Sequence, residues 1–264
     1  MRLYQNRLVV KVGTSTLTND LGNSDLRSFE RIARVLSDIR NRGYEVILVS
    51  SGAIAVGSNK LGLKTRPESL RIKQAAAAIG QCAIMFLYDK FFGEYGTTIA
   101  QILLNAEDME NEEKKNNLLN TFDALLEMGV IPVVNENDSV SYTEIQSEEK
   151  LFGDNDMLSA VVAVLCKASR LVILSDIDGL YDGDPRSSKK SKIIQRVERI
   201  DDTVMSYAGG AGSRRGKGGM ITKLQSARLA TSAGIDTVIT NGKNPDNIYS
   251  VLQNLPVGTL FTAN

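Results

Sequence analysis

The sequence predicts an α/β fold with a mostly parallel central sheet sandwiched between helices. Short runs rich in valine, isoleucine and leucine recur at 8–12, 45–50, 130–134 and 171–174, and each ends in small or polar residues. Such runs are typical of strands buried on both faces of a parallel sheet. Segments with helical spacing of apolar residues lie between them, and strand–helix–strand units imply right-handed parallel crossovers.

The composition limits the classes of function. The chain has 264 residues, with 31 basic and 31 acidic side chains, so no global field favours nucleic acid or an anionic membrane. No apolar run is long enough to span a bilayer, and we expect a cytoplasmic protein. The absence of histidine excludes serine–histidine and cysteine–histidine catalysis and histidine-ligated metals. We expect Cys82 and Cys166 to be buried structural thiols.

The first half of the chain alternates between strands and helices. A helix is expected over 25–41, and the strand 45–50 leads into the small-residue turn at Ser51-Gly52-Ala53. Residues 67–95 have helical character, with Gly80 as a candidate break between two helices. The next expected elements are a strand at 98–104, a helix at 111–128, a strand at 130–134 and a hairpin or lid at 140–152.

The second half repeats the alternation. A helix is expected from Gly153-Asp154-Asn155-Asp156 to Cys166, followed by a strand at 171–174. A glycine-rich stretch at 207–219 opens a helix over 220–233. A strand at 237–240, a short helix after Pro245 and a strand at 258–262 complete the chain.

A lysine interrupts the first strand. Burying an unpaired ammonium group is costly, so Lys11 either reaches water at the end of the strand or points into a site there. Open α/β sheets bind ligands at the carboxyl ends of their strands, which favours the second interpretation once the rest of the chain is considered.

The glycine-rich stretch matches neither common nucleotide-binding motif. Gly218 stands where a Walker A loop has Ser or Thr, and the stretch does not follow a first strand as a dinucleotide fingerprint does. It could be a solvated surface loop. However, it runs into a helix whose free N–H groups suit phosphate, and Lys223 lies in the first turn, where the helix dipole disfavours a cation unless an anion binds.

These residues together suggest phosphoryl transfer. Lys11 and Lys223 could flank the transferring group, and Asp154 could hold both ammonium groups in register. A carboxylate acceptor is already ionised at neutral pH, so it needs no general base and the lack of histidine is no obstacle. Mg²⁺ and paired lysines would relieve the repulsion between two anions.

Six motifs in order resemble the amino-acid kinase family, and within it the branch that phosphorylates glutamate. They begin at Lys11 (Lys-Val-Gly-Thr-Ser-Thr-Leu-Thr), Ser51 (Ser-Gly-Ala-Ile-Ala-Val-Gly), Asn135 (Asn-Glu-Asn-Asp), Gly153 (Gly-Asp-Asn-Asp), Ser175 (Ser-Asp-Ile-Asp-Gly-Leu-Tyr) and Gly218 (Gly-Gly-Met-Ile-Thr-Lys). They span nearly the whole chain.

The resemblance implies ATP- and Mg²⁺-dependent phosphorylation of the side-chain carboxylate of L-glutamate, the first step of proline synthesis. It also implies feedback inhibition by proline and a homodimer or homotetramer. Lys11, Lys223 and Asp154 would be catalytic. The implied glutamate-binding residues are Ser51, Gly52, Ala53, Asp138, Asn155 and Asp156. The implied ATP-binding residues are Gly13, Ser175, Asp176, Tyr181, Lys217, Gly218, Gly219, Met220, Ile221, Thr222 and Lys223.

The expected domain organisation is one kinase domain over 1–264, binding glutamate through about 1–168 and ATP through about 169–264. No metal site built from protein ligands is expected. Many family members continue into a PUA domain, which resembles RNA-binding modules; we expect none here, and no nucleic-acid or membrane partner. Two alternatives stay open: a kinase for another small carboxylate such as acetylglutamate, and a non-catalytic sensor of glutamate or proline.

Overall fold

The computed structural model describes residues 3–19, 22–65, 67–140, 154–183, 185, 191–208 and 219–263. The chain divides into two compact units: unit 1 comprises Met1–Lys11 and Asp154–Asn264, and unit 2 comprises Val12–Gly153. Most of the expected 140–152 lid lies outside the described residues. The expected assignment of glutamate to 1–168 and ATP to 169–264 concerns binding and stays a prediction.

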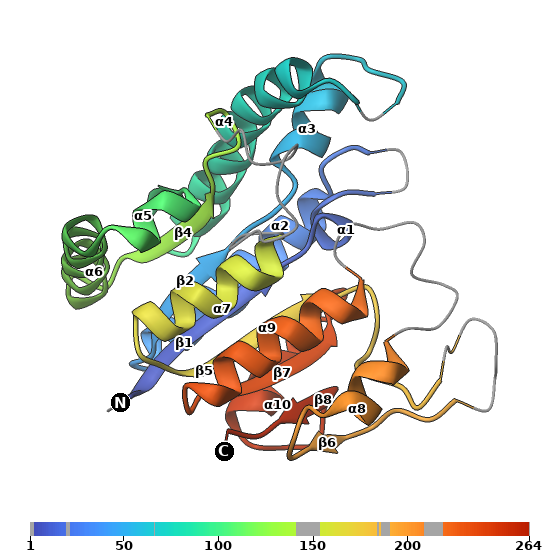
Figure 1. The fold of residues 1–264 in the computed structure, drawn as a ribbon. Coiled ribbons are helices and arrows are strands. Elements are labelled where there is room, and N and C mark those ends of the chain that lie inside the picture. Colours follow the sequence, from blue (N-terminus) through green and yellow to red (C-terminus); the bar gives the residue numbers. More distant parts are fainter. Residues whose placement is uncertain are drawn as a thin grey trace. The chain divides into compact units, whose positions relative to one another are not determined.

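Unit 1 is a sheet with the strand order β1-β5-β7-β8-β6. Its strands are β1 (Tyr4–Val12), β5 (Ala168–Ser175), β6 (Arg196–Val197), β7 (Asp236–Asn241) and β8 (Thr259–Phe261). Strands β5 and β7 are parallel, whereas β8 pairs antiparallel with β7. The helices are α7 (Asn155–Leu165), α8 (Asp202–Tyr207), α9 (Met220–Ser232) and α10 (Asn247–Leu252). Helices α7 and α9 pack against each other and lie over β5 and β7 (Figure 1).

Unit 2 has the parallel strand order β3-β4-β2. Its strands are β2 (Glu45–Val49), β3 (Ile99–Leu104) and β4 (Ile131–Glu136). Its helices are α1 (Thr14–Leu17), α2 (Leu26–Asn41), α3 (Ala53–Lys60), α4 (Leu70–Glu94), α5 (Ala106–Glu110) and α6 (Glu112–Glu127). Helix α2 packs on β2 and α4, and α6 packs on β4. The expected α/β class with a mostly parallel sheet is therefore confirmed.

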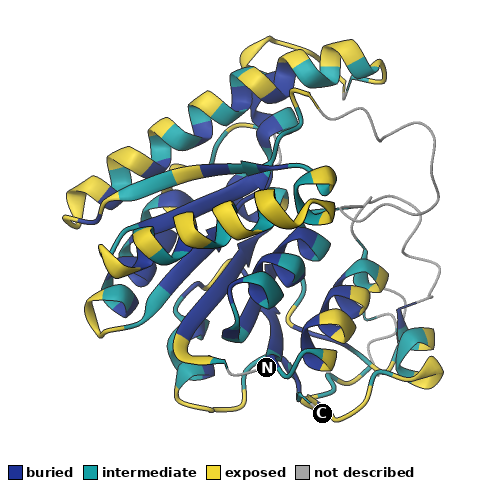
Figure 2. Ribbon diagram, turned by 60° about the vertical axis from the view of Figure 1, so that its left-hand side comes forward, coloured by how far each residue is buried: buried dark blue, intermediate teal, exposed yellow. Residues whose placement is uncertain are grey.

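The strands lie in the buried core because they carry apolar side chains on both faces of the sheet. All four residues from Leu171 to Leu174 are fully buried, as are Ile47 and Leu48. Figure 2 shows the buried strands in dark blue and the outward faces of the helices in yellow. By length and composition alone, α4 is the one helix among the described residues that could cross a membrane, but core helices pass the same test. Its Tyr88 and Phe92 are fully buried and contact each other.

Two glycines allow α3 and α4 to pack backbone against backbone. A Cβ atom added to Gly57 would lie 1.7 Å from the carbonyl oxygen of Ala76, and one added to Gly80 would lie 1.8 Å from that of Ala53. Such separations are far below van der Waals contact. Helix α4 runs unbroken through Gly80, so the expected break there is wrong. This glycine serves close packing rather than helix termination.

We expect Gly80→Ala to destabilise the protein, although Gly→Ala usually stabilises a helix by about 1 kcal/mol. The added methyl group meets a backbone carbonyl that cannot move without separating the helices, and overpacking of this kind costs about 1–3 kcal/mol. Urea unfolding measures the effect. Gly93→Ala on the same helix is the matched control, because nothing lies within 4 Å of its added Cβ. Equal midpoints for the two variants would contradict the packing argument.

The two cysteines differ in their environments. Cys166 is buried at the end of α7, as expected. Cys82 is exposed, so the expectation of a buried thiol is wrong at this position. Helix α4 carries small and aliphatic residues on more than one face. The apolar neighbours of Cys82 in the sequence therefore do not reveal whether its own face is covered.

Candidate active site

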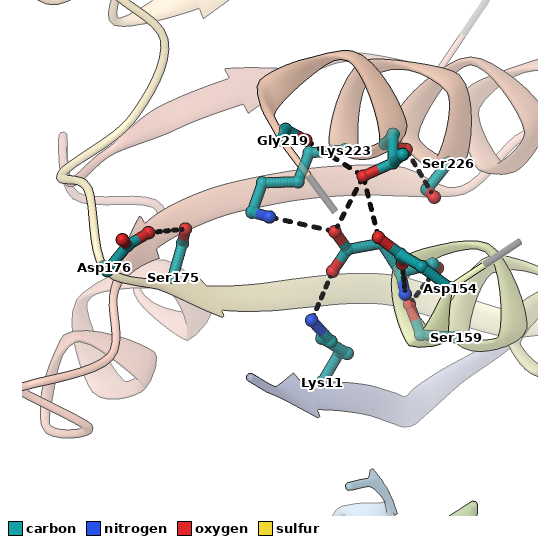
Figure 3. A network of polar contacts seen from close by, with 10 residues as sticks. Lys11, Asp154, Ser159, Ser175, Asp176, Gly219, Lys223 and Ser226 are labelled. Atoms are coloured by element: carbon teal, nitrogen blue, oxygen red, sulfur yellow. Dashed lines mark hydrogen bonds and ion pairs between the residues drawn. The ribbon is translucent and has the colours of Figure 1, made fainter. Parts of the chain in front are cut away.

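A buried carboxylate joins the two lysines singled out in the sequence. Lys11 Nζ lies 2.5 Å from Asp156 Oδ1, and Lys223 Nζ donates a hydrogen bond of 2.9 Å to Asp156 Oδ2. The side chains of Lys11 and Lys223 are 8% and 9% exposed, and that of Asp156 is fully buried. Figure 3 shows both labelled lysines directed at one carboxylate, with strand β1 and helix α9 supplying them. All three residues belong to unit 1.

The cluster keeps Asp156 ionised and retains a positive charge. Burial by itself would raise the pKa of Asp156, but the charges of Lys11 and Lys223 and their hydrogen bonds outweigh it, so the pKa lies below its usual value. The carboxylate also lies in the first turn of α7, where the helix dipole favours an anion. Two ammonium groups around one carboxylate leave one positive charge in excess. The arrangement is suited to a transferring phosphoryl group.

Asp154 does not occupy the position expected from the sequence. It is the N-cap of α7, and its side chain accepts a hydrogen bond from the backbone N–H of Asp156. Its Oδ2 accepts from the hydroxyl of Thr222 at 2.9 Å. The carboxylate between Lys11 and Lys223 is therefore that of Asp156, and the expectation that Asp154 holds both ammonium groups is corrected. Capping requires a side chain at the first position, which leaves the residue two positions later to face the lysines.

Thr222 links the two acidic residues to the start of α9. Its hydroxyl lies 3.3 Å from Asp156 Oδ2 and also contacts the carbonyl oxygen of Gly219, at 2.9 Å. Ser226 donates to the Thr222 carbonyl, and Ser159 donates to the Asp156 carbonyl. These contacts hold the first turn of α7, which carries Asp156, beside the first turn of α9, which carries Lys223.

Most of the other described residues expected to bind ATP lie at three places in unit 1. Gly219, which has no side chain to cap the helix, is the N-cap of α9, and Met220 and Ile221 lie in its first turn. Ser175 ends β5 and donates to Asp176, at 3.2 Å, as Figure 3 shows. The Tyr181 hydroxyl donates to Asp178. Lys217 and Gly218 lie outside the described residues.

The residues expected to bind glutamate fall mostly in unit 2. Ser51 is buried, and Gly52 has a φ of 97°, a left-handed conformation that favours glycine at the N-cap of α3. Ala53 and Asp138 line one pocket of about 450 Å³. Gly13, expected to bind ATP, precedes α1 in the same unit. Asn155 is the first residue of α7 in unit 1.

The pocket contains groups that the motif analysis did not select. Gln81 and Glu136 line it together with Asp138. Asn135 donates a hydrogen bond of 2.8 Å to Gln81. Asn135 and Glu136 belong to the Asn-Glu-Asn-Asp motif, which could have pointed to them. No motif includes Gln81, so only the packing of α4 beside the end of β4 reveals it.

We expect the contribution of Asp156 to stability to be constant at neutral pH and lost only in acid. Its folded-state pKa is lowered, so the contribution is fully present above the unfolded value of about 3.9 and disappears as pH falls through the lower folded value. Urea midpoints of the wild-type protein and Asp156→Asn, measured from pH 8 to pH 3, test this. Their difference should stay level down to about pH 5 and shrink below about pH 4. A gap that narrows between pH 8 and pH 6 would contradict the assignment.

The chain is similar in sequence to known proteins. The model of the amino acid kinase family matches residues 6–241. A glutamate 5-kinase of Clostridium perfringens is 55% identical over 97% of this chain and 95% of its own length. A glutamate 5-kinase of Listeria innocua is 48% identical over 97% of this chain and 93% of its own length.

Solved structures with low sequence identity share the fold. A carbamate kinase from Giardia lamblia has a TM-score of 0.67 and 15% identity, covering 98% of this chain and 99% of that one. An isopentenyl phosphate kinase from T. acidophilum has a TM-score of 0.64 and 18% identity, covering 97% and 99%. At these identities the likeness extends to the fold alone.

Proposed function

Because the chain belongs to the amino acid kinase family, we propose that it transfers the γ-phosphoryl group of ATP to the side-chain carboxylate of L-glutamate. The product is L-glutamyl 5-phosphate, the first intermediate of proline biosynthesis. The observation that carries the proposal is the buried Lys11–Asp156–Lys223 cluster. The relatives at 55% and 48% identity, which are glutamate 5-kinases, support the choice of acceptor.

The cluster stabilises the charge that develops during transfer. Lys11 and Lys223 supply ammonium groups to the equatorial oxygens of the transferring phosphoryl group, while Asp156 holds the two groups in position. Asp154 acts one step further out, by capping α7 and binding Thr222. The acceptor carboxylate is ionised at neutral pH, so no protein group has to remove a proton.

The nucleotide is bound by unit 1. Helix α9 starts with backbone N–H groups that its N-cap Gly219, lacking a side chain, does not cap, and such groups suit phosphate oxygens. Ser175 and Asp176 follow at the carboxyl end of β5, where α/β sheets bind ligands. Mg²⁺ would be held mainly by the phosphates of the nucleotide. When bound, Mg²⁺ neutralises phosphate charge.

Glutamate is bound with its ammonium group near Asp138 in the unit 2 pocket, supported by Ser51, Gly52 and Ala53. Asn155, at the start of α7 in unit 1, is proposed as a further glutamate-binding residue on its sequence motif alone. The acidic lining of the pocket favours a free ammonium group over an acetylated one, which disfavours acetylglutamate.

Proline, which also carries an ammonium and a carboxylate, inhibits by overlapping this site. The enzyme works in the cytoplasm as a homodimer or homotetramer.

The proposal is tested by trapping the acyl phosphate with hydroxylamine in reactions containing ATP, Mg²⁺ and L-glutamate. Parallel reactions contain acetylglutamate, aspartate or no acceptor. Hydroxamate from glutamate alone is the expected result. Turnover of acetylglutamate instead would overturn the acceptor assignment. Binding of glutamate or proline by the folded protein with no turnover of any acceptor would favour the sensor alternative.

A further inference from the structure

Among the described residues that line the unit 2 pocket, every charged side chain is acidic. Glu136 and Asp138 are acidic, and none of the described lining residues is a lysine or an arginine. An amino acid bound here can place its ammonium group near these carboxylates. Neutral N–H or O–H donors of the lining are then suited to its α-carboxylate, because an unpaired anion beside two carboxylates would be strongly disfavoured.

Gln81 offers such a donor in a fixed orientation. The side-chain nitrogen of Asn135 donates to the side-chain oxygen of Gln81 at 2.8 Å, which occupies the acceptor end of the Gln81 amide. Its NH₂ group donates to no other side chain or backbone atom of the described residues, so two N–H donors remain for a ligand. Asn135 is 2% exposed and lies near the end of β4, and Gln81 lies within α4.

We propose that Gln81 binds the α-carboxylate of the glutamate acceptor and that Asn135 positions it for this contact. The inference rests on the proposed function and adds a specificity residue to it. Both side chains stand on regular elements, a strand end and a helix, so the amide is held more rigidly than a loop residue would be. The pocket then distinguishes an α-amino acid from an amine or an acid of the same length.

The test compares Gln81→Met and Gln81→Glu with the wild-type enzyme in the hydroxamate assay. Loss of hydrogen bonds to a charged group should raise the KM for L-glutamate about 10- to 100-fold in Gln81→Met, with a smaller change in kcat. Gln81→Glu should raise it further, because a carboxylate repels the α-carboxylate. Gln74→Met, two turns earlier on α4 and outside the pocket lining, is the control and should keep the wild-type KM.

A truncated ligand separates recognition from a structural role. 4-Aminobutyrate lacks the α-carboxylate, so its inhibition constant as a competitor should be the same for the wild-type enzyme and Gln81→Met. Equal weakening of 4-aminobutyrate and glutamate would overturn the inference, as would a glutamate KM unchanged within about twofold in both Gln81 variants. A wild-type enzyme that does not phosphorylate glutamate would instead be a failure of the proposed function.

Discussion

Replacing Asp156 with asparagine is expected to destabilise the protein by about 3–5 kcal/mol and to lower kcat at least about 100-fold. The substitution leaves two nearly buried ammonium groups, those of Lys11 and Lys223, without the carboxylate that compensates them. It also removes the group that fixes their positions. Urea unfolding and the hydroxamate assay measure the two effects separately.

Asp154→Asn is the matched control for this prediction. Asparagine caps helices about as well as aspartate, so α7 should keep its start, and neither lysine loses its ion pair. We expect a change in stability below about 1 kcal/mol. If Asp154→Asn destabilised the protein as much as Asp156→Asn, the central role of Asp156 would be untenable. The double variant Asp156→Asn/Lys223→Met should recover part of the lost stability, because it leaves one buried cation instead of two.

Lys223→Met is expected to lower kcat about 100- to 1,000-fold while changing the KM for glutamate little. In the proposed reaction the ammonium group of Lys223 contributes most when charge develops on the transferring phosphoryl group, so its loss should raise the barrier more than it weakens ground-state binding. Methionine keeps the length and apolar stem of lysine. Asp156 retains its ion pair with Lys11, so the variant should fold.

Steady-state kinetics and calorimetric binding of glutamate check this expectation. Lys115→Met provides the control, because Lys115 lies on the surface of α6 and pairs only with Glu112 among the described residues. A large rise in the KM for glutamate with an unchanged kcat would show that Lys223 binds the acceptor rather than acting during transfer.

The sequence was sufficient to predict the alternating strands and helices. Valine- and isoleucine-rich runs such as 45–49 and 171–174 form buried strands because both faces of a parallel sheet are covered. The two-residue strand β6 at Arg196–Val197 was not predicted, since so short a segment has no periodicity. The continuity of α4 through Gly80 was also missed, because close contact with α3 is a tertiary effect.

The candidate site was predicted in part. Lys11 and Lys223 do lie at one cluster, as their unusual positions suggested. Whether Asp154 or Asp156 faces the lysines depends on which of them caps α7. Both are acceptable caps, so the sequence does not distinguish them. Gln81 could not be found, because its orientation depends on a hydrogen bond to a residue far along the chain. The ligand-binding roles themselves stay predictions.

The division of the chain has a consequence for folding order. Unit 1 combines the first eleven residues with a segment that starts at Asp154, whereas unit 2 is continuous in sequence. On the ribosome, unit 2 can therefore form while β1 still waits for its neighbour β5, whose residues emerge later. At about 5–20 residues per second this wait lasts roughly 10–30 s. The pairing of Lys11 with Asp156 closes a long loop, so the Lys11–Asp156–Lys223 cluster is among the last features to assemble during synthesis.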